Sequence, residues 1–230
     1  MEGSRELGQI VWRRATPPAK LMSEITNEKV EQYLYQILPE RDAVLRDMEA
    51  QAKQRDIPIV GPAVGRLLYQ LARMVNAKTV FEAGSAIGYS TIWWARAVGE
   101  GGRVVYTDSD KKNADEARGY FERAGVADRV DIRIGDALEI LSEQRPASYD
   151  VVFNDVDKED YPRVFKLAVP RVRPGGLFIT DNALWSGRVV APEDERSRAV
   201  AEFNRMLYAS KDVFTTIIPL RDGVAVAMKA

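Results

Sequence analysis

The chain has 230 residues, of which 46% are hydrophobic and 29% charged, and its formal net charge is −1. This composition is typical of a soluble globular domain and provides no overall charge that would attract nucleic acid. The chain contains no Cys and no His, which excludes disulfides, thiolate nucleophiles, Ser-His-Asp triads and His-ligated metals. Any general base must be Lys, Asp, Glu or Tyr, and any metal must accept oxygen ligands, which favours Mg²⁺, Mn²⁺ or Ca²⁺.

The first 22 residues are expected to form a flexible arm, broken at Pro17 and Pro18. The arm lacks the apolar core of a secretory signal. No run in the chain reaches the roughly 18–20 apolar residues that a membrane span needs. We therefore expect a cytoplasmic protein without membrane contact. The arm is locally basic, and its cations are Arg5, Arg13, Arg14 and Lys20.

Residues 23–230 are expected to form a single domain, with a helical part at 23–76 before an α/β core at 77–230. A first helix starts near Asn27 and ends at Pro39, a more charged helix covers 40–55, and a third begins at Pro62. We expect the apolar stripes of the first and third helices to belong to the core. These stripes are Val30, Leu34, Ile37 and Leu38, and then Leu67, Leu68, Leu71, Met74 and Val75.

From residue 79 onward, short apolar runs alternate with helical patterns, which predicts βαβ units and a mostly parallel sheet. The expected strands are 79–83, 103–107, 130–134, 149–154, 176–181, 213–219 and 223–229. The expected helices are 89–98, 111–124, 137–144, 159–172 and 194–208. Only the tight connection "LRDG" joins the last two strands, so these two must run antiparallel.

The segment "FEAGSAIGYS" (81–90) reads as a strand, a turn with Gly84 and Gly88, and a helix start. Its glycine spacing matches neither a dinucleotide fingerprint nor a P-loop. Asp108 and Asp136 end the next two strands, where they are suited to ribose hydroxyls and an adenine amino group, although an Asp at this position is commonly a helix cap. Together the residues indicate a cleft for a nucleoside without phosphates. S-adenosylmethionine (SAM) fits this cleft, with Glu82 partly balancing its positive charge.

A second group of polar residues follows the fourth and fifth strands. Asp155 ends one strand, and Asp181 and Asn182 end the other. If these strands are neighbours, three oxygen donors converge, and an octahedral cation keeps about three sites for water or substrate, which suits Mg²⁺. The alternative is that Asp155 caps the following helix while Asp181 and Asn182 only turn the chain.

Four segments carry a family resemblance: "FEAGSAIGYS", "DRVDIRIGDALEIL", "YDVVFNDVDKEDY" and "RPGGLFITDNALWSGRVV". Together they resemble the cation-dependent O-methyltransferases of the catechol and caffeoyl-CoA type, over about residues 57–229. The resemblance implies a class I methyltransferase fold, a Rossmann-like sheet of seven strands with helices on both faces and only the last-inserted strand antiparallel. Relatives are commonly homodimers, so a homodimer is expected here.

The resemblance also implies roles for individual residues. Asp155, Asp181 and Asn182 match the metal ligands, and Lys158 matches the lysine that takes the phenolic proton. Positions similar to those that hold SAM are Val60, Gly61, Glu82, Gly84, Ser85, Tyr89, Ser90, Asp108, Asp136, Ala137, Asp155 and Asp157. The chain departs from the family pattern at Asn154 and Val156, and at Val60, where some plant relatives have Thr; none of these is a predicted ligand.

The expected reaction is methylation of one hydroxyl of a catechol-like phenol, with Lys158 as the base. Trp185 either stacks on the acceptor ring or serves only for packing, and Trp12, Arg13 and Arg14 either fold over the cleft or contact a partner subunit. Some bacterial relatives with a similar glycine loop methylate a hydroxylated uridine in tRNA, and the basic arm leaves this alternative open. A further alternative, from another class, is a non-catalytic nucleoside-binding module on the same scaffold.

Overall fold

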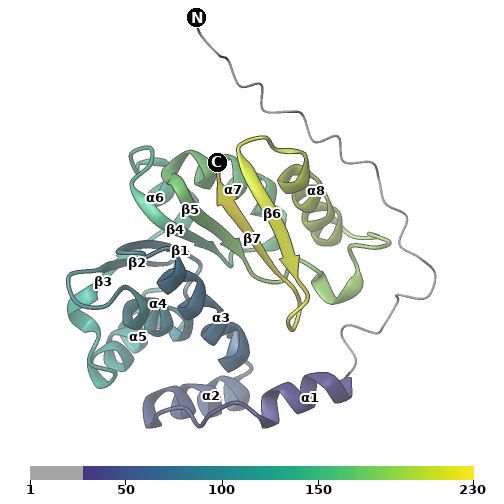
Figure 1. The fold of residues 1–230 in the computed structure, drawn as a ribbon. Helices are drawn as coiled ribbons and strands as arrows, with labels where there is room; N and C mark the ends of the chain where they lie inside the picture. Colours follow the sequence, from purple (N-terminus) through teal and green to yellow (C-terminus); the bar gives the residue numbers. More distant parts are fainter. Residues whose placement is uncertain (1–27) are drawn as a thin grey trace, which may run out of the picture.

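Seven strands form one sheet in the order β3-β2-β1-β4-β5-β7-β6 (Figure 1). The computed structural model describes residues 28–230, so the expected arm at 1–22 lies outside the described residues. The strands are β1 (Thr79–Ala83), β2 (Arg103–Asp108), β3 (Val130–Ile134), β4 (Tyr149–Asn154), β5 (Val172–Thr180), β6 (Val213–Ile218) and β7 (Val224–Lys229). Strands β1 to β5 pair in parallel, whereas β7 runs antiparallel to both β5 and β6. The predicted sheet with a single antiparallel strand is confirmed.

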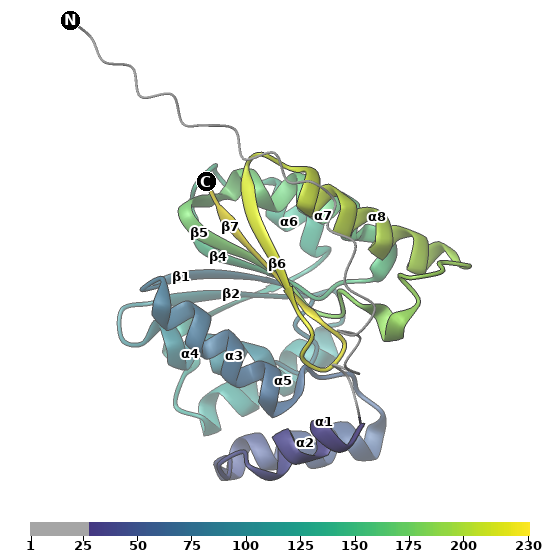
Figure 2. The same cartoon turned by 45° about the vertical axis from the view of Figure 1, so that its right-hand side comes forward.

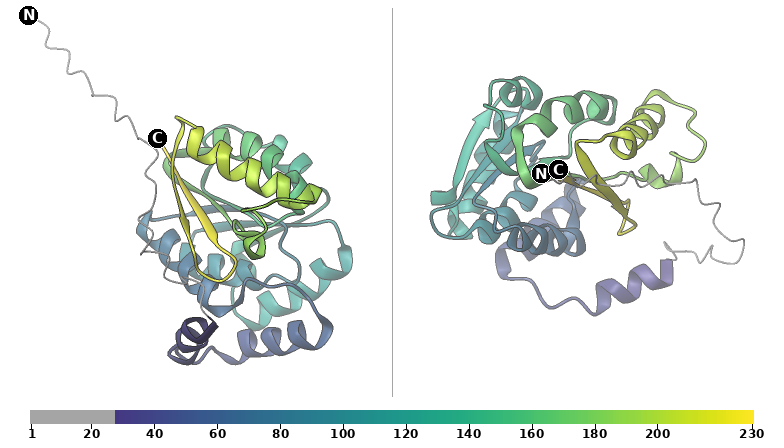
Figure 3. Two further views of the ribbon diagram at one scale, coloured as in Figure 1. Left: turned by 90° about the vertical axis from the view of Figure 1, so that its right-hand side faces the viewer. Right: turned by 45° about the horizontal axis from the view of Figure 1, so that its top comes forward.

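Helices cover both faces of this sheet, with α3, α4 and α5 on one face and α6, α7 and α8 on the other (Figures 1 and 2). The α-helices are α1 (Glu28–Gln36), α2 (Ala43–Arg55), α3 (Gly61–Met74), α4 (Tyr89–Val98), α5 (Lys111–Arg123), α6 (Ala137–Ser142), α7 (Tyr161–Ala168) and α8 (Glu195–Ala209). Short 3₁₀ segments lie at Ala127–Arg129, Lys158–Asp160, Val169–Arg171 and Trp185–Gly187. Both α1 and α2 lie beyond the edge of the sheet at which the β6–β7 turn is found (Figure 3).

Two elements differ from the sequence-based expectation. The helix expected over 159–172 is divided into a 3₁₀ segment, α7 and a second 3₁₀ segment. Pro162 occupies the first turn of α7 and Pro170 lies in the following segment, and because proline has no backbone N–H it starts a helix well but cannot continue one. Strand β5 begins at Val172, before the expected start at 176, because Val172 already pairs with Tyr149 of β4.

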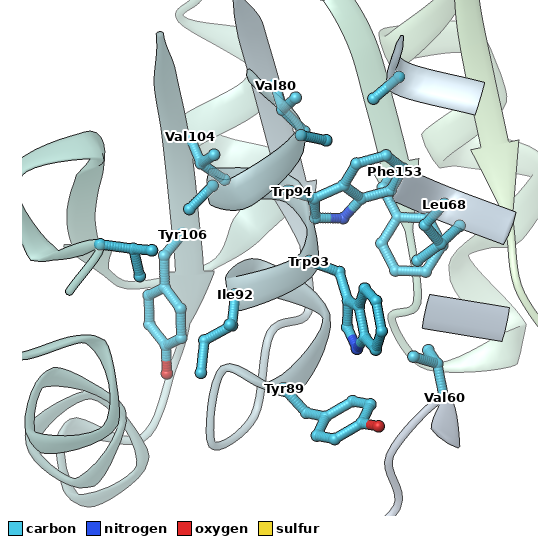
Figure 4. Packing of buried hydrophobic residues seen from close by; sticks show 14 of the residues in the cluster. Val60, Leu68, Val80, Tyr89, Ile92, Trp93, Trp94, Val104, Tyr106 and Phe153 are labelled. Atoms are coloured by element: carbon cyan, nitrogen blue, oxygen red, sulfur yellow. The ribbon is translucent and has the colours of Figure 1, made fainter. Parts of the chain in front are cut away.

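The two sheet faces carry separate apolar clusters, because a mostly parallel sheet must be covered on both sides. Under α3 and α4, Trp94 packs against Phe153 of β4 with ring centroids 5.5 Å apart (Figure 4). The indole of Trp93 lies between α4 and α3, directly against Gly65. A Cβ atom at this glycine would collide with the indole, so the close approach of the two helices requires Gly65.

The apolar stripe of α1 is not part of the core, contrary to expectation. Val30 is 50% exposed, Leu34 38% and Ile37 57%, and Met74 at the end of α3 is 71% exposed. Helical spacing predicts an apolar face but does not say what covers it, and α1 extends beyond the sheet. No helix in the described part of the chain is both long and apolar enough to cross a membrane.

Candidate functional site

A cavity of about 540 Å³ lies at the carboxyl ends of β1, β2, β4 and β5. Most of the residues predicted from the sequence line it, although they come from distant parts of the chain. These residues are Val60, Gly84, Ser85, Tyr89, Ser90, Asp108, Asp136, Ala137, Asp155, Asp157, Lys158, Asp181, Asn182 and Trp185. Such a position at the strand ends is where open α/β sheets bind their ligands.

The glycine loop after β1 forms one wall of the cavity. Gly84 has φ +80°, and a Cβ atom on it would lie 2.5 Å from the Asp155 carbonyl oxygen, so only glycine fits there. The Ser85 amide donates to the Thr107 carbonyl over 3.0 Å, and the Asp155 amide donates to the Ala83 carbonyl over 2.9 Å. These bonds hold the loop against β2 and β4 and bring Asp155 to the cavity.

Two aspartates at strand ends both cap local structure and line the cavity. Asp136 Oδ1 accepts from the amides of Leu138, at 2.7 Å, and Glu139, at 2.9 Å, and so caps α6. Asp108 Oδ1 accepts from the Asp110 amide over 2.8 Å. Asp136 is therefore a helix cap, as the alternative proposed. This role does not exclude cofactor binding, because both carboxylates line the cavity.

Glu82 and Gly61 were also predicted to hold the cofactor, but neither lines the cavity. Glu82 is fully buried behind the glycine loop and accepts a hydrogen bond from the Thr91 hydroxyl. Burial raises the pKa of Glu82 to about 7, against the opposing effect of the hydroxyls of Ser90 and Thr91. Gly61 starts α3 with φ +73°, next to Val60, which does line the cavity.

Tyr89 begins α4 and lines the cavity with a ring that is almost fully buried. Its hydroxyl, on the side of the ring that faces Val60 in Figure 4, donates to Glu49 Oε1 of α2 over 2.7 Å. Glu49 in turn pairs with Arg41 at 2.5 Å. The helical N-terminal part is thereby tied to the wall of the cavity.

The predicted metal ligands come from neighbouring strands, since β4 pairs with β5. Asp181 is buried, and its Oδ1 atom has no hydrogen-bond partner among the described residues. Burial raises the pKa of Asp181, and the nearby Asp155 carboxylate raises it further. Burial also raises the pKa of Asp155, against the opposing effect of the Lys158 ammonium. Asp155 is thus paired with one cation, whereas Asp181 forms no ion pair within residues 28–230.

The alternative roles expected for Asp155 and Asn182 have different outcomes. The Asp155 side chain pairs with Lys158 and caps no helix among the described elements. Asn182 does turn the chain: its φ is +55°, and its carbonyl accepts from the Trp185 amide over 3.2 Å. Nowhere in residues 28–230 are three or more His, Cys, Asp or Glu side chains arranged to hold a metal ion. The expected set consists of two carboxylates and one amide.

Lys158 is held at the cavity wall by polar groups and by aromatic rings. Its Nζ atom lies 3.3 Å from Asp155 Oδ1 and 3.2 Å from the Val156 carbonyl. The ammonium also lies over two aromatic rings, 4.9 Å from the centroid of Tyr161 and 5.5 Å from that of Trp185. Trp185 therefore contacts the predicted base and lines the cavity, and its indole nitrogen is buried without a partner among the described residues.

Arg221 lines the cavity but was not predicted from the sequence. It belongs to the β6–β7 connection, which was interpreted only as a tight turn. A hairpin that ends beside β5 returns its turn to the carboxyl edge of the sheet, where Asp181 and Asn182 lie. That topology was the signal that could have drawn attention to this residue.

The O-methyltransferase family model matches residues 35–230 of this chain. A catechol O-methyltransferase of Niastella koreensis is 35% identical over 216 residues, which cover 87% of this chain and 96% of that protein. Caffeoyl-CoA O-methyltransferase 1 of Arabidopsis thaliana is 31% identical over 85% of this chain and 84% of its own.

Two solved structures share the fold at similar identity. The O-methyltransferase from Bacillus cereus in complex with SAH is 32% identical with a TM-score of 0.78, and the match covers 88% of this chain and 97% of that one. TomG from Streptomyces achromogenes, solved in complex with SAM, is 32% identical with a TM-score of 0.79, covering 91% of this chain and all of that one. With the strand order and the site at the strand ends, these matches show that the chain belongs to the O-methyltransferase family, together with the catechol and caffeoyl-CoA O-methyltransferases.

Proposed function

We propose that this protein transfers a methyl group from SAM to one hydroxyl of a catechol-like phenol and needs a divalent cation to do so. The observation that carries the proposal is the carboxylate pair of buried Asp181 and half-buried Asp155 beside Lys158. In the cavity of an O-methyltransferase, two carboxylates beside a lysine that is fixed in position are suited to activating a hydroxyl group. The catechol and caffeoyl-CoA enzymes among the relatives support a phenolic acceptor.

The residues present fit a hard divalent cation. Asp181 Oδ1 is buried without a partner, and the other donors, Asp155 and Asn182, are also oxygen ligands of the kind that Mg²⁺ accepts. When bound, such a cation would lower the pKa of a coordinated phenol from its usual value of about 10 and orient two vicinal hydroxyls. Asp155, Asp181 and Asn182 are the residues that would hold it.

The methyl donor is proposed to occupy the part of the cavity lined by the glycine loop. Gly84 and Ser85 lie on one side, and Asp108 and Asp136 lie at the ends of β2 and β3, where ribose and adenine would be bound. Glu82 is behind this wall and contacts Ser90 and Thr91, of which Ser90 lines the cavity, so it would act on the cofactor only indirectly. The SAM and SAH complexes of the relatives support this donor.

The chain's own residues then move one proton. Lys158 Nζ, fixed by Asp155 and the Val156 carbonyl, is positioned to take the proton of the reacting hydroxyl once the ammonium has released its own proton to solvent. The phenolate formed attacks the methyl carbon of the sulfonium, and the carbon–sulfur bond breaks to leave SAH. Trp185 flanks the ring and helps to exclude water. Alignment of the two reactants can lower the barrier by roughly 7–11 kcal/mol.

Methyl transfer from SAM to 3,4-dihydroxyphenyl compounds, measured with Mg²⁺ and with EDTA, tests the proposal. We expect turnover only with the cation, and Asp155→Ala should abolish it while SAM binding survives. Asp128→Ala is the matched control, because this aspartate is exposed and distant from the cavity. Full activity in the chelator would refute the requirement for a cation.

The alternative acceptor is a hydroxylated uridine in tRNA. The basic arm that left it open lies outside the described residues, so this alternative stays a prediction. Assays on hypomodified tRNA beside the catechol panel separate the two, because RNA binding weakens steeply with salt whereas catechol turnover should not.

A further inference from the structure

Arg221 differs from the other cations that line the cavity because its charge is not paired. Lys158 Nζ lies 3.3 Å from Asp155, and Arg196 Nε lies 2.8 Å from Glu159. Arg221 forms no ion pair with any residue in 28–230; its Nη1 atom donates to a neutral group, the Ile59 carbonyl, over 2.5 Å. Its side chain is exposed, so the remaining N–H donors of the guanidinium are available to a ligand.

The backbone around Arg221 holds it in an unfavourable conformation. Its φ of +54° is in the left-handed region, which glycine would occupy without strain and which side-chain-bearing residues adopt rarely. Strain of this kind is commonly kept where a side chain has a function. The chain has an arginine at a position where local structure alone favours glycine.

Hydrogen bonds also join the turn to the two loops that bound the side of the cavity where the acceptor would bind. Asp222 Oδ1 accepts from the Ser186 amide over 2.5 Å, and the Asp222 carbonyl accepts from the Leu184 amide over 2.9 Å. These bonds join the turn to the loop that carries Asn182 and Trp185. On the other side, the bond from Arg221 to Ile59 joins it to the loop before α3. The turn that carries Arg221 is therefore held from both sides.

Apart from Lys158 and Arg196, which are paired with carboxylates, the charged residues that line the cavity are acidic, so Arg221 is the place where a negative group could be accepted. The carboxylates that line it are Asp108, Asp136, Asp155, Asp157, Asp160 and Asp181. Arg221 lines the same cavity as Asp155, Asp181 and Asn182, and the Leu184 amide, two residues after Asn182, donates to the carbonyl of the adjacent Asp222. Arg221 is thus close to the point where the acceptor hydroxyls would be held.

Building on the proposed catechol methylation, we propose that Arg221 binds a carboxylate substituent of the phenolic acceptor. The preferred acceptors are then dihydroxyphenyl acids rather than neutral catechols. Arginine is suited to this because its planar fork can bind a carboxylate through two parallel hydrogen bonds. The hydroxyls would be held at Asp155, Asp181 and Asn182, and the carboxylate at the opposite end of the ring.

The test compares 3,4-dihydroxybenzoate with the neutral 3,4-dihydroxybenzamide. The wild type should prefer the acid by about 10-fold or more in kcat/KM, as expected for a charge-assisted hydrogen bond. In Arg221→Gln this preference should fall to near unity, mainly through KM for the acid, and Arg221→Lys should keep part of it. Arg145→Gln is the matched control, since this exposed arginine lies before β4 and outside the cavity.

Three results would overturn the inference: no preference for the acid in the wild type, equal losses on acid and amide in Arg221→Gln, or a raised KM for SAM with the preference intact. The last result would assign Arg221 to the carboxylate of the methyl donor. Calorimetric binding of acid and amide in the presence of SAH repeats the comparison without turnover. Failure of the proposed function itself would instead appear as no methylation of any catechol.

Discussion

Lys158 has surroundings unlike those of most lysines, which are solvated on the surface. Its side chain is only 11% exposed, and it contacts one carboxylate, one carbonyl and two aromatic rings. Together these contacts restrict the ammonium to one place in the cavity wall. The side chain is therefore positioned before a substrate binds, which general base catalysis requires.

Replacing Lys158 with Met should lower kcat by about 10²–10⁴-fold, the usual contribution of a positioned acid or base. Cation binding should persist, because Asp155, Asp181 and Asn182 are unchanged. Turnover and Mg²⁺ titration of the same variant separate the two effects. Unchanged turnover would show that Lys158 is not the base.

The buried carboxylates make the cation-free protein sensitive to pH. Burial raises the pKa of Glu82 to about 7 and also raises the pKa of Asp155 and Asp181, whose ordinary value is 3.8. A carboxyl group with a raised pKa in the folded state binds protons more readily there than in the unfolded chain. In chelator, stability should therefore fall as pH rises from about 4 to neutrality.

A divalent cation should act in the opposite direction, because it replaces the protons on Asp155 and Asp181. Mg²⁺ should stabilise the protein increasingly as pH rises to neutrality and little at pH 5. Urea unfolding at several pH values, with Mg²⁺ and with EDTA, measures this difference. If the cation stabilised the protein equally at pH 5 and pH 8, the carboxylates would not be its ligands. Asp181→Asn should remove most of the pH dependence of the Mg²⁺ effect.

At the scale of elements, the junction of β1, the glycine loop and β4 decides whether the site forms. Gly84 combines φ +80° with a contact at which a Cβ atom would lie 2.5 Å from a backbone oxygen of Asp155. Backbone cannot move aside as a flexible side chain can. The loop and the strand that delivers Asp155 therefore depend on each other.

Gly84→Ala should destabilise the protein by about 2–4 kcal/mol, from strain in the backbone together with overpacking. Methyl transfer should fall further than stability alone explains, because Asp155 would be displaced. Gly119→Ala in α5 is the matched control: nothing lies within 4 Å of its added Cβ, and it should stabilise by about 0.5–1 kcal/mol. Chemical denaturation measures both; an undamaged Gly84→Ala would contradict the proposed dependence.

At the scale of the whole molecule, an apolar face formed by α1 and α3 remains uncovered within residues 28–230. Tyr33 is 59% exposed, Ile37 57% and Met74 71%, and Leu34 and Ile37 line a groove together with residues of α3. Such a concentration of exposed apolar side chains is typical of an interface. We propose a second copy of the chain as the partner, in keeping with the expected homodimer.

Light scattering should then give a mass of about twice the 25.8 kDa of one chain. Ile37→Glu should shift the protein to the monomer, because a charge would be buried in the contact. Val190→Glu is the control, as Val190 is 88% exposed and lies outside this face. A monomeric wild type would exclude the second copy.

The strands, most helices and the family could be predicted from local patterns, because alternation of apolar runs and the motifs around Gly84, Asp155 and Asp181 depend on neighbouring residues only. The division of the helix expected over 159–172 also depends on local residues, because Pro162 and Pro170 lie in that segment. The prediction of one continuous helix did not include their effect. The roles of the site residues stay predictions, although nearly all of them line one cavity.

Long-range packing decided the rest. Val30 and Ile37 have the spacing of a core helix, yet α1 extends past the sheet, so no local rule could show that they are exposed. Arg221 lies far from Asp181 in sequence and reaches the cavity only because β7 inserts antiparallel between β5 and β6. Hydrophobic periodicity predicts that a helix has an apolar face. What covers that face depends on how elements that are distant in sequence pack against each other.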